Sequence, residues 1–125
     1  FRPGDHGSTF GGNPLAAEVG LAALEVLLDE GLCERSAALG AYLLEALQRI
    51  RSPLVRAVRG RGLFVGIDFD PARVRAYDVA LRLLERGILT RDTHDTVIRL
   101  APPLTITREE LDDAIRRVRE VIAAL

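Results

Sequence analysis

The sequence predicts an α+β domain in which helices pack on a small, mostly antiparallel or mixed sheet. Two observations support this prediction. In four segments, apolar residues recur at spacings of three and four, which is typical of amphipathic helices. Between these segments the period shifts toward two, which is typical of strands. The predicted order is helix, helix, strands, helix, strands, helix.

The first two helices are marked by their ends. Asn13 is a suitable N-cap and Pro14 suits the first helical position. An apolar stripe then continues toward Gly31, formed by Leu15, Val19, Ala22, Ala23, Val26 and Leu27. The second helix is expected to stop at Ser52-Pro53 and to bury one face, formed by Leu32, Ser36, Leu39, Leu43, Leu47 and Ile50.

Strands are predicted on both sides of a third helix. Residues 55–59 form one strand, Gly60-Arg61-Gly62 a tight connection, and the next strand alternates Leu63, Val65, Ile67 and Phe69. A helix should follow, closed at Arg86-Gly87 and packed through Val74, Tyr77, Leu81 and Leu84. Residues 88–90 and 96–100 are expected to be strands around the turn at residues 92–95. Pro102 and Pro103 cannot donate to a ladder and should end the sheet.

The last helix carries the clearest start signal. Thr107 and Glu110 have the spacing of a capping box. The apolar residues that follow at helical spacing predict the buried face, namely Leu111, Ile115, Val118 and Ile122.

Composition excludes several classes of function. The chain has 125 residues, 48% hydrophobic and 28% charged, and its net charge of -1 offers no field for nucleic acid or anionic lipid. No apolar run approaches the roughly 20 residues of a membrane span. The chain contains no Met, and we expect it to be a piece of a longer protein. Cys33 is the only cysteine, so no internal disulfide can form and a reducing cytoplasm is expected. Its thiol is expected to be buried and structural.

The segment before the first helix could bind an anion. Ser8 and Thr9 carry hydroxyl donors, the glycines around them allow close approach of backbone N–H groups, and a helix N-terminus follows. This chemistry suits a phosphate or a carboxylate. On composition alone, however, a plain N-cap loop is the favoured interpretation.

Arg99 is the second candidate, because it interrupts an apolar strand just before the double proline. A guanidinium held rigidly there suits bidentate capture of a carboxylate. An edge-strand arginine facing water, or one paired with Asp68 or Asp95, is equally supported. The arginines of Arg59-Gly60-Arg61-Gly62 could also bind an anion, but a structural role in the turn is favoured.

No other chemistry is evident in the sequence. His6 and His94 lack Cys or acidic neighbours at ligand spacing, so no metal is expected. There is no nucleophile triad, P-loop or dinucleotide fingerprint. All seventeen basic residues are arginine, so no side-chain amine can form a Schiff base.

Three motifs nevertheless resemble one family, the class III (fold type I) pyridoxal-phosphate-dependent aminotransferases. Residues 4–15 are similar to the segment shortly after the Schiff-base lysine, and residues 58–63 to the start of the C-terminal small domain. Residues 93–104, with Thr93-His94 and an Arg-x-Ala-Pro-Pro-Leu run, are most similar to the ornithine aminotransferase branch. The motifs occur in the family's order and span the chain.

The resemblance implies roles for three residues. Ser8 and Thr9 match the loop that contacts the pyridoxal 5'-phosphate, with Thr9 reaching into the active site of the partner subunit of a homodimer. Arg99 matches the arginine that binds a substrate carboxylate. The implied reaction moves the δ-amino group of ornithine to 2-oxoglutarate, a 2-oxo acid, giving glutamate and glutamate semialdehyde.

The resemblance also implies an architecture. Residues 1–13 would be a cofactor-phosphate loop left from the large domain, 14–52 connecting helices, and 53–125 the α+β small domain. No position matches the Schiff-base lysine, so no catalytic residue is assigned and the chain is expected to be inactive alone. An acetylornithine or other class III aminotransferase is the nearest alternative. A non-catalytic module for anion binding or dimerisation is an alternative of another class.

Overall fold

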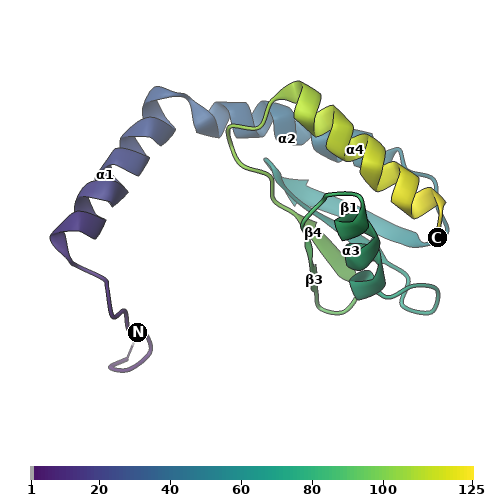
Figure 1. The fold of residues 1–125 in the computed structure, drawn as a ribbon, viewed down its shortest axis with the longest axis horizontal. Coiled ribbons are helices and arrows are strands. Elements are labelled where there is room, and N and C mark those ends of the chain that lie inside the picture. Colours follow the sequence, from purple (N-terminus) through teal and green to yellow (C-terminus); the bar gives the residue numbers. More distant parts are fainter. Residues whose placement is uncertain (1) are drawn as a thin grey trace. The chain divides into compact units, whose positions relative to one another are not determined.

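The computed structural model describes residues 2–125. They form two compact units, one ending at Cys33 and the other covering Glu34–Leu125. Helices and strands follow the predicted order (Figure 1). Among the described residues, no helix is both long and apolar enough to span a membrane.

The first unit is built around one helix, α1 (Pro14–Asp29). It begins where predicted, because the Asn13 side chain accepts a hydrogen bond from the backbone N–H of Ala16 (2.9 Å). The predicted amphipathic stripe is wrong, however. No residue of α1 is buried, and exposed apolar side chains lie on two opposite sides of it, namely Leu15, Val19 and Val26 on one and Leu21, Leu24 and Leu28 on the other. A helix with apolar residues beyond a single stripe is usually covered by other protein.

The second unit contains one antiparallel sheet of four strands. These are β1 (Val55–Arg61), β2 (Phe64–Phe69), β3 (Arg91–Thr93) and β4 (Val97–Leu100). The strand order is β1-β2-β4-β3, so β4 lies inside the sheet between β2 and β3. This α+β architecture confirms the predicted fold class.

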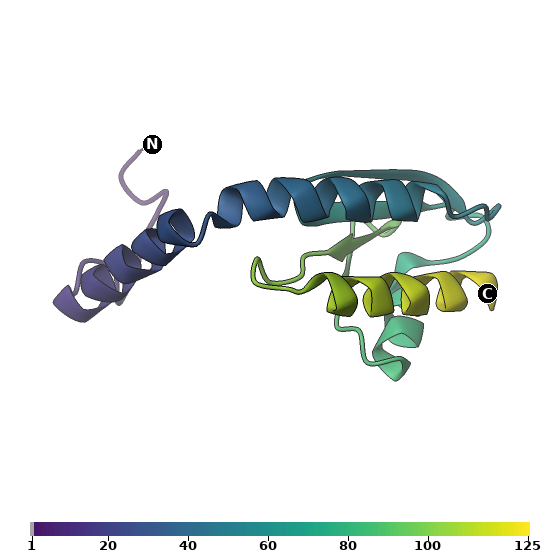
Figure 2. The same ribbon diagram turned by 90° about the horizontal axis from the view of Figure 1, so that it is seen from above.

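Helices cover one face of this sheet and leave the other open. In both views, α2 (Leu32–Gln48) and α4 (Arg108–Ala123) run side by side, and α3 (Ala76–Glu85) lies close to α4 (Figures 1 and 2). Their buried side chains meet every second residue of β2 and β4, forming a core that includes Leu43, Leu47, Val65, Ile67, Phe69, Val79, Leu83, Ile98, Leu111, Ile115 and Val118. We call the opposite side of the sheet the outer face.

The connection between β1 and β2 is shorter than predicted. Gly60 and Arg61 belong to β1, and only Gly62 and Leu63 form the turn. Gly62 has a φ of +56°, a conformation that suits glycine. The turn lies against α2, where Ser36 Oγ accepts a hydrogen bond from the Leu63 N–H (3.2 Å).

Two predictions between β2 and β4 are wrong. Residues 88–90 are not a strand, because β3 starts three residues later, at Arg91. The Ile88 N–H instead bonds the carbonyl of Leu83 (2.9 Å) and closes α3. The buried face of α3 is Ala76, Val79 and Leu83, while Tyr77, Leu81 and Leu84 are exposed. The helix starts later than expected, so the stripe that faces the core is a different one.

The last helix forms as predicted. The Glu110 N–H donates to Thr107 Oγ (3.1 Å) and the Thr107 N–H donates to the Glu110 carboxylate (2.8 Å). All four predicted apolar positions, Leu111, Ile115, Val118 and Ile122, are buried.

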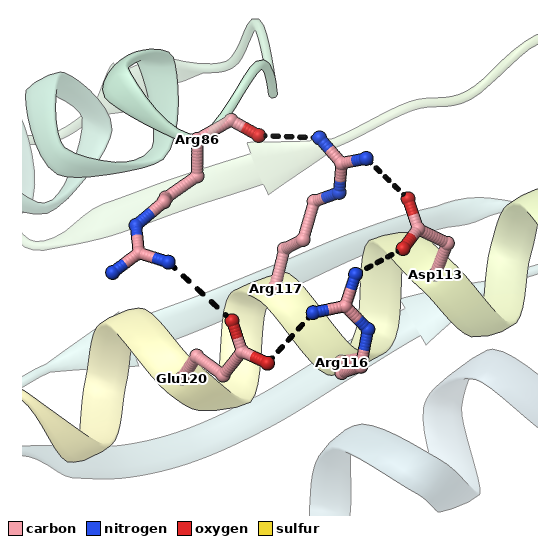
Figure 3. A network of polar contacts seen from close by, with 5 residues as sticks. All are labelled: Arg86, Asp113, Arg116, Arg117 and Glu120. Carbon is pink, nitrogen blue, oxygen red and sulfur yellow. Dashed lines mark hydrogen bonds and ion pairs between the residues drawn. The ribbon is translucent and has the colours of Figure 1, made fainter.

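Ion pairs join the end of α3 to α4 (Figure 3). Arg117 bonds the carbonyl of Arg86 (2.7 Å) and pairs with Asp113 (2.6 Å). Arg116 bridges Asp113 and Glu120 along one side of α4. We call these five residues the α3–α4 network, and it complements the apolar contact between the two helices.

Candidate carboxylate site on the outer face

Arg99 projects from the outer face of the sheet. Strand pairing places it opposite Gly66 in β2 and Arg91 in β3, while its neighbour Ile98 turns into the core. Its backbone is held by Thr90, whose hydroxyl donates to the Arg99 carbonyl (2.7 Å). The side chain is exposed, so it does not incur the desolvation cost of a buried guanidinium.

Arg99 faces water, as the edge-strand interpretation expected, but the strand assignment and the ion pair of the two alternative interpretations are wrong. Its strand is internal, and among residues 2–125 no carboxylate pairs with it, Asp68 and Asp95 included. What it does contact is an aromatic ring: the Arg99 guanidinium carbon lies 5.6 Å from the centroid of Phe64. The guanidinium is therefore positioned but not neutralised.

A hollow of about 380 Å³ surrounds this arginine on the outer face. Its walls come from β1, β2, β4 and the β3–β4 turn, and they include Arg59, Arg61, Phe64, Gly66, His94 and Arg99. Of the residues that the structure describes, three arginines and no carboxylate line it, so it offers positive potential to an anion. A side chain in place of Gly66 would press on Val97 Cγ1, at 3.1 Å.

Asp68 neutralises the far end of this arginine group. It pairs with Arg56 (2.9 Å) and Arg59 (3.6 Å). Burial raises the pKa of Asp68, but hydrogen bonds from Arg56 and Thr96 and the two arginine charges outweigh it and leave that pKa below its usual value. Arg59 therefore has the structural role favoured for this motif. Arg61 also lines the hollow, and among residues 2–125 no carboxylate pairs with it.

The β3–β4 turn brings His94 to the same hollow. His94 and Asp95 both have left-handed backbone, with φ of 52° and 62°. Two consecutive residues with positive φ form the kind of tight turn that matches the twist of a hairpin. Such conformations cost free energy for non-glycine residues and tend to persist at functional sites.

Ser8 and Thr9 lie in the exposed loop of the first unit. Ser8 Oγ accepts a hydrogen bond from the Gly11 N–H (2.8 Å), which leaves the hydroxyl proton free to be donated. Gly12 has a φ of +80° and precedes the Asn13 cap. The loop thus combines free hydroxyl donors with a helix N-terminus, a donor set that fits the phosphate of a pyridoxal 5'-phosphate.

Sequence reasoning missed two members of the outer-face hollow. Phe64 has no donor for an anion, and His94 was considered only as a possible metal ligand. The signal for Phe64 was its parity: it alternates with the buried Leu63 and Val65, so it had to face outward. Ser8 and Thr9 lie in the first unit and Arg99 in the second.

Two other sequence predictions can be compared with the structure. Among residues 2–125, no group of three or more His, Cys, Asp or Glu side chains could hold a metal ion. The prediction of a buried thiol is wrong, because Cys33 is exposed. It is the second residue of α2.

Comparison with known proteins identifies the family. The class III aminotransferase family model matches residues 1–122. The ornithine aminotransferase of Staphylococcus carnosus is 55% identical over 98% of this chain and is covered over 30% of its own length.

Solved structures agree with the family match. An ornithine aminotransferase of Plasmodium yoelii aligns over 99% of this chain and 33% of its own, with a TM-score of 0.89 and 47% identity. The acetylornithine aminotransferase of Elizabethkingia anophelis aligns over the whole chain and 34% of its own, with a TM-score of 0.87 and 42% identity. The chain thus spans about a third of the length of its relatives, and it belongs to the class III aminotransferase family.

Proposed function

We propose that this chain is the C-terminal part of a pyridoxal-phosphate-dependent ornithine:2-oxo-acid aminotransferase. The enzyme would move the δ-amino group of ornithine to 2-oxoglutarate and release glutamate and glutamate semialdehyde. The observation that carries the proposal is Arg99, a positioned guanidinium in a positively charged hollow, with no carboxylate partner within residues 2–125. The ornithine aminotransferase names of similar proteins support the donor.

Arg99 would bind and orient a carboxylate of the substrate. Its planar fork can donate two parallel hydrogen bonds, and the rigid internal strand β4 fixes where they point. Arg61 and His94 line the same hollow, where Arg61 would add positive potential and His94 a further ring N–H donor. Orientation of this kind lowers the barrier to amine transfer because the reacting groups are held in place before the reaction.

Ser8 and Thr9 would hold the cofactor phosphate, with Thr9 reaching into the partner's site of a homodimer. The cofactor, when bound, supplies the electron sink for amine transfer. We assign no catalytic residue in this chain and propose that it is inactive alone, because it contains no lysine. Residues 1–13 would then belong to the large domain, 14–52 would connect, and 53–125 would form the small domain of a cytoplasmic enzyme.

Assay of the full-length enzyme with two amine donors tests the proposal. We expect turnover with ornithine and 2-oxoglutarate, measured as glutamate semialdehyde formed, to exceed turnover with acetylornithine. The second candidate is an acetylornithine aminotransferase, which the likeness to the Elizabethkingia anophelis enzyme supports. A preference for the acetylated donor would decide for that candidate.

A further inference from the structure

Phe64 is an exposed aromatic residue at the start of the second strand of the sheet. It opens β2, is 57% exposed, and turns toward the outer face, while its neighbours Leu63 and Val65 are buried. Phe64 lines the same hollow as Arg59, Arg61 and Arg99. Phe64 contacts Arg99, the arginine that we propose binds a substrate carboxylate.

The contact has the geometry of a cation–π interaction. The Arg99 guanidinium carbon is 5.6 Å from the ring centroid, within the roughly 6 Å over which a ring face attracts a cation. Gly66 lies opposite Arg99 in the neighbouring strand and presents no side chain beside it. Asp68, the nearest acidic residue of the same face of β2, is engaged by Arg56 and Arg59.

The ring is itself rigidly placed. Leu63, the preceding residue, is 3% exposed and its N–H is bonded to Ser36 of α2 (3.2 Å). Phe64 is also the first residue of the ladder, paired with Arg61. The backbone on both sides of the ring is therefore fixed by the core and by the sheet.

We propose that Phe64 is a positioning residue for Arg99, an inference that rests on the proposed function. A ring attracts the guanidinium through its face without accepting any N–H bond, so the donors of Arg99 remain free for a carboxylate. A flexible arginine would lose side-chain entropy on binding, and the ring removes part of that loss in advance. A carboxylate neighbour in the same place would instead compete with the substrate.

The test uses three single variants and one double variant of the full-length enzyme. Phe64→Leu keeps an apolar side chain but removes the ring, and Phe64→Tyr keeps the ring. Arg99→Gln removes the charge. For each we would measure the Kd of glutarate, a dicarboxylate that cannot react, by calorimetry, and the KM and kcat for 2-oxoglutarate. The double variant Phe64→Leu/Arg99→Gln tests whether the two residues act together.

In Phe64→Leu we expect the Kd of glutarate and the KM for 2-oxoglutarate to rise about two- to fivefold, with kcat unchanged. A rise of this size corresponds to the loss of an exposed cation–π contact. Phe64→Tyr should restore wild-type values. In the Arg99→Gln background, Phe64→Leu should have no further effect. A purely structural role would lower kcat and stability in Phe64→Leu and would persist without the Arg99 charge.

The failures of the two proposals can be told apart. If the enzyme turns over ornithine and Phe64→Leu binds glutarate as tightly as wild type, the positioning role is wrong and the proposed function stands. If ornithine is not a donor, the glutarate titration still decides whether Phe64 positions Arg99. Tighter binding in Phe64→Leu would show that the ring holds Arg99 away from the substrate, and would overturn the inference.

Discussion

Arg99 combines a fixed backbone with a guanidinium that no carboxylate neutralises. It lies on an internal strand whose backbone is bonded on both sides, and its guanidinium has no carboxylate partner among the described residues. Other exposed arginines of the second unit do form ion pairs, as Arg49 does with Glu45 and Arg73 with Asp70. These properties of Arg99 support its proposed role in binding a substrate carboxylate.

Replacing Arg99 with Ala should therefore impair binding of 2-oxoglutarate. Loss of a bidentate carboxylate contact costs about 2–4 kcal/mol, so KM in the full-length enzyme should rise from about thirty- to several-hundred-fold. The control is Arg91→Ala. It removes the same charge from the residue opposite Arg99, and Arg91 is not among the residues that line the hollow. An unchanged KM in Arg99→Ala would exclude the assigned role.

The hydroxyl of Thr9 should matter for the cofactor. Thr9→Ala removes one donor from a loop that we propose binds the phosphate, so the full-length enzyme should retain less pyridoxal 5'-phosphate after dialysis. Thr9→Ser keeps the hydroxyl and should behave as wild type. Absorbance of the retained cofactor measures both. Equal retention in all three proteins would leave Thr9 as an ordinary loop residue.

At the scale of elements, the contact between α2 and the β1–β2 turn sets the position of the hollow. Gly40 of α2 is buried, and a Cβ on it would collide with the backbone of Gly62. A Cβ on Gly62 would in turn lie 2.6 Å from Ser36 Oγ. The helix and the turn approach this closely only because both residues are glycine. Phe64 and Arg61 flank that turn.

Gly40→Ala should thus destabilise the second unit strongly, by about 2–4 kcal/mol, because backbone atoms and not a flexible side chain must move. Gly20→Ala is a matched control in α1, where a Cβ meets nothing within 4 Å and the substitution should favour the helix by about 1 kcal/mol. Urea unfolding of the chain, followed by circular dichroism, would measure both. Equal effects would contradict the close contact.

Acid should weaken α4 and its link to α3. Hydrogen bonds from Arg116 and Arg117 hold the pKa of Asp113 below its usual value, and hydrogen bonds from the backbone and side chain of Thr107 do the same for Glu110. A depressed folded-state pKa adds stability above the unfolded-state pKa, about 4, and this stability is lost as pH falls through the lower, folded-state value.

We therefore expect Asp113→Asn to be less stable than wild type at pH 7 and equally stable near pH 2. Unfolding midpoints measured across this range would show the two curves converge. Because the α3–α4 network is exposed, added salt should also shrink the difference at pH 7. A difference that stays constant from pH 7 to pH 2 would contradict the assigned cause.

At the scale of the whole molecule, we propose that the chain supplies groups for binding but none for the covalent step. Its seventeen basic residues are all arginine. Titration of the chain with pyridoxal 5'-phosphate should therefore produce no absorbance band of a lysine imine, and at most weak phosphate affinity. Acetylation of the N-terminal amine controls for the one remaining amine. An imine band in the acetylated chain would contradict the proposal that this chain has no group for the covalent step.

Local signals in the sequence were sufficient for much of this protein. Asn13-Pro14, the Thr107 and Glu110 capping box, and the alternation from Leu63 to Phe69 each concern hydrogen bonds or pleating within a few residues, so a single sequence specifies them. The motifs at residues 4–15 and 93–104 likewise sufficed to indicate the aminotransferase family. The α+β class followed from the order of these elements.

Only the tertiary structure decided which faces meet. The face of α3 that is buried depends on where the helix begins, which is after its N-cap Arg75. Strand β3 forms at Arg91 because its backbone partners lie on β4, not because its residues favour a strand. The sequence alone could not decide whether Arg99 is paired with a carboxylate. Whether an arginine is paired depends on strand order, and it is the order β1-β2-β4-β3 that places Phe64 beside Arg99 while Asp68 is engaged by other arginines.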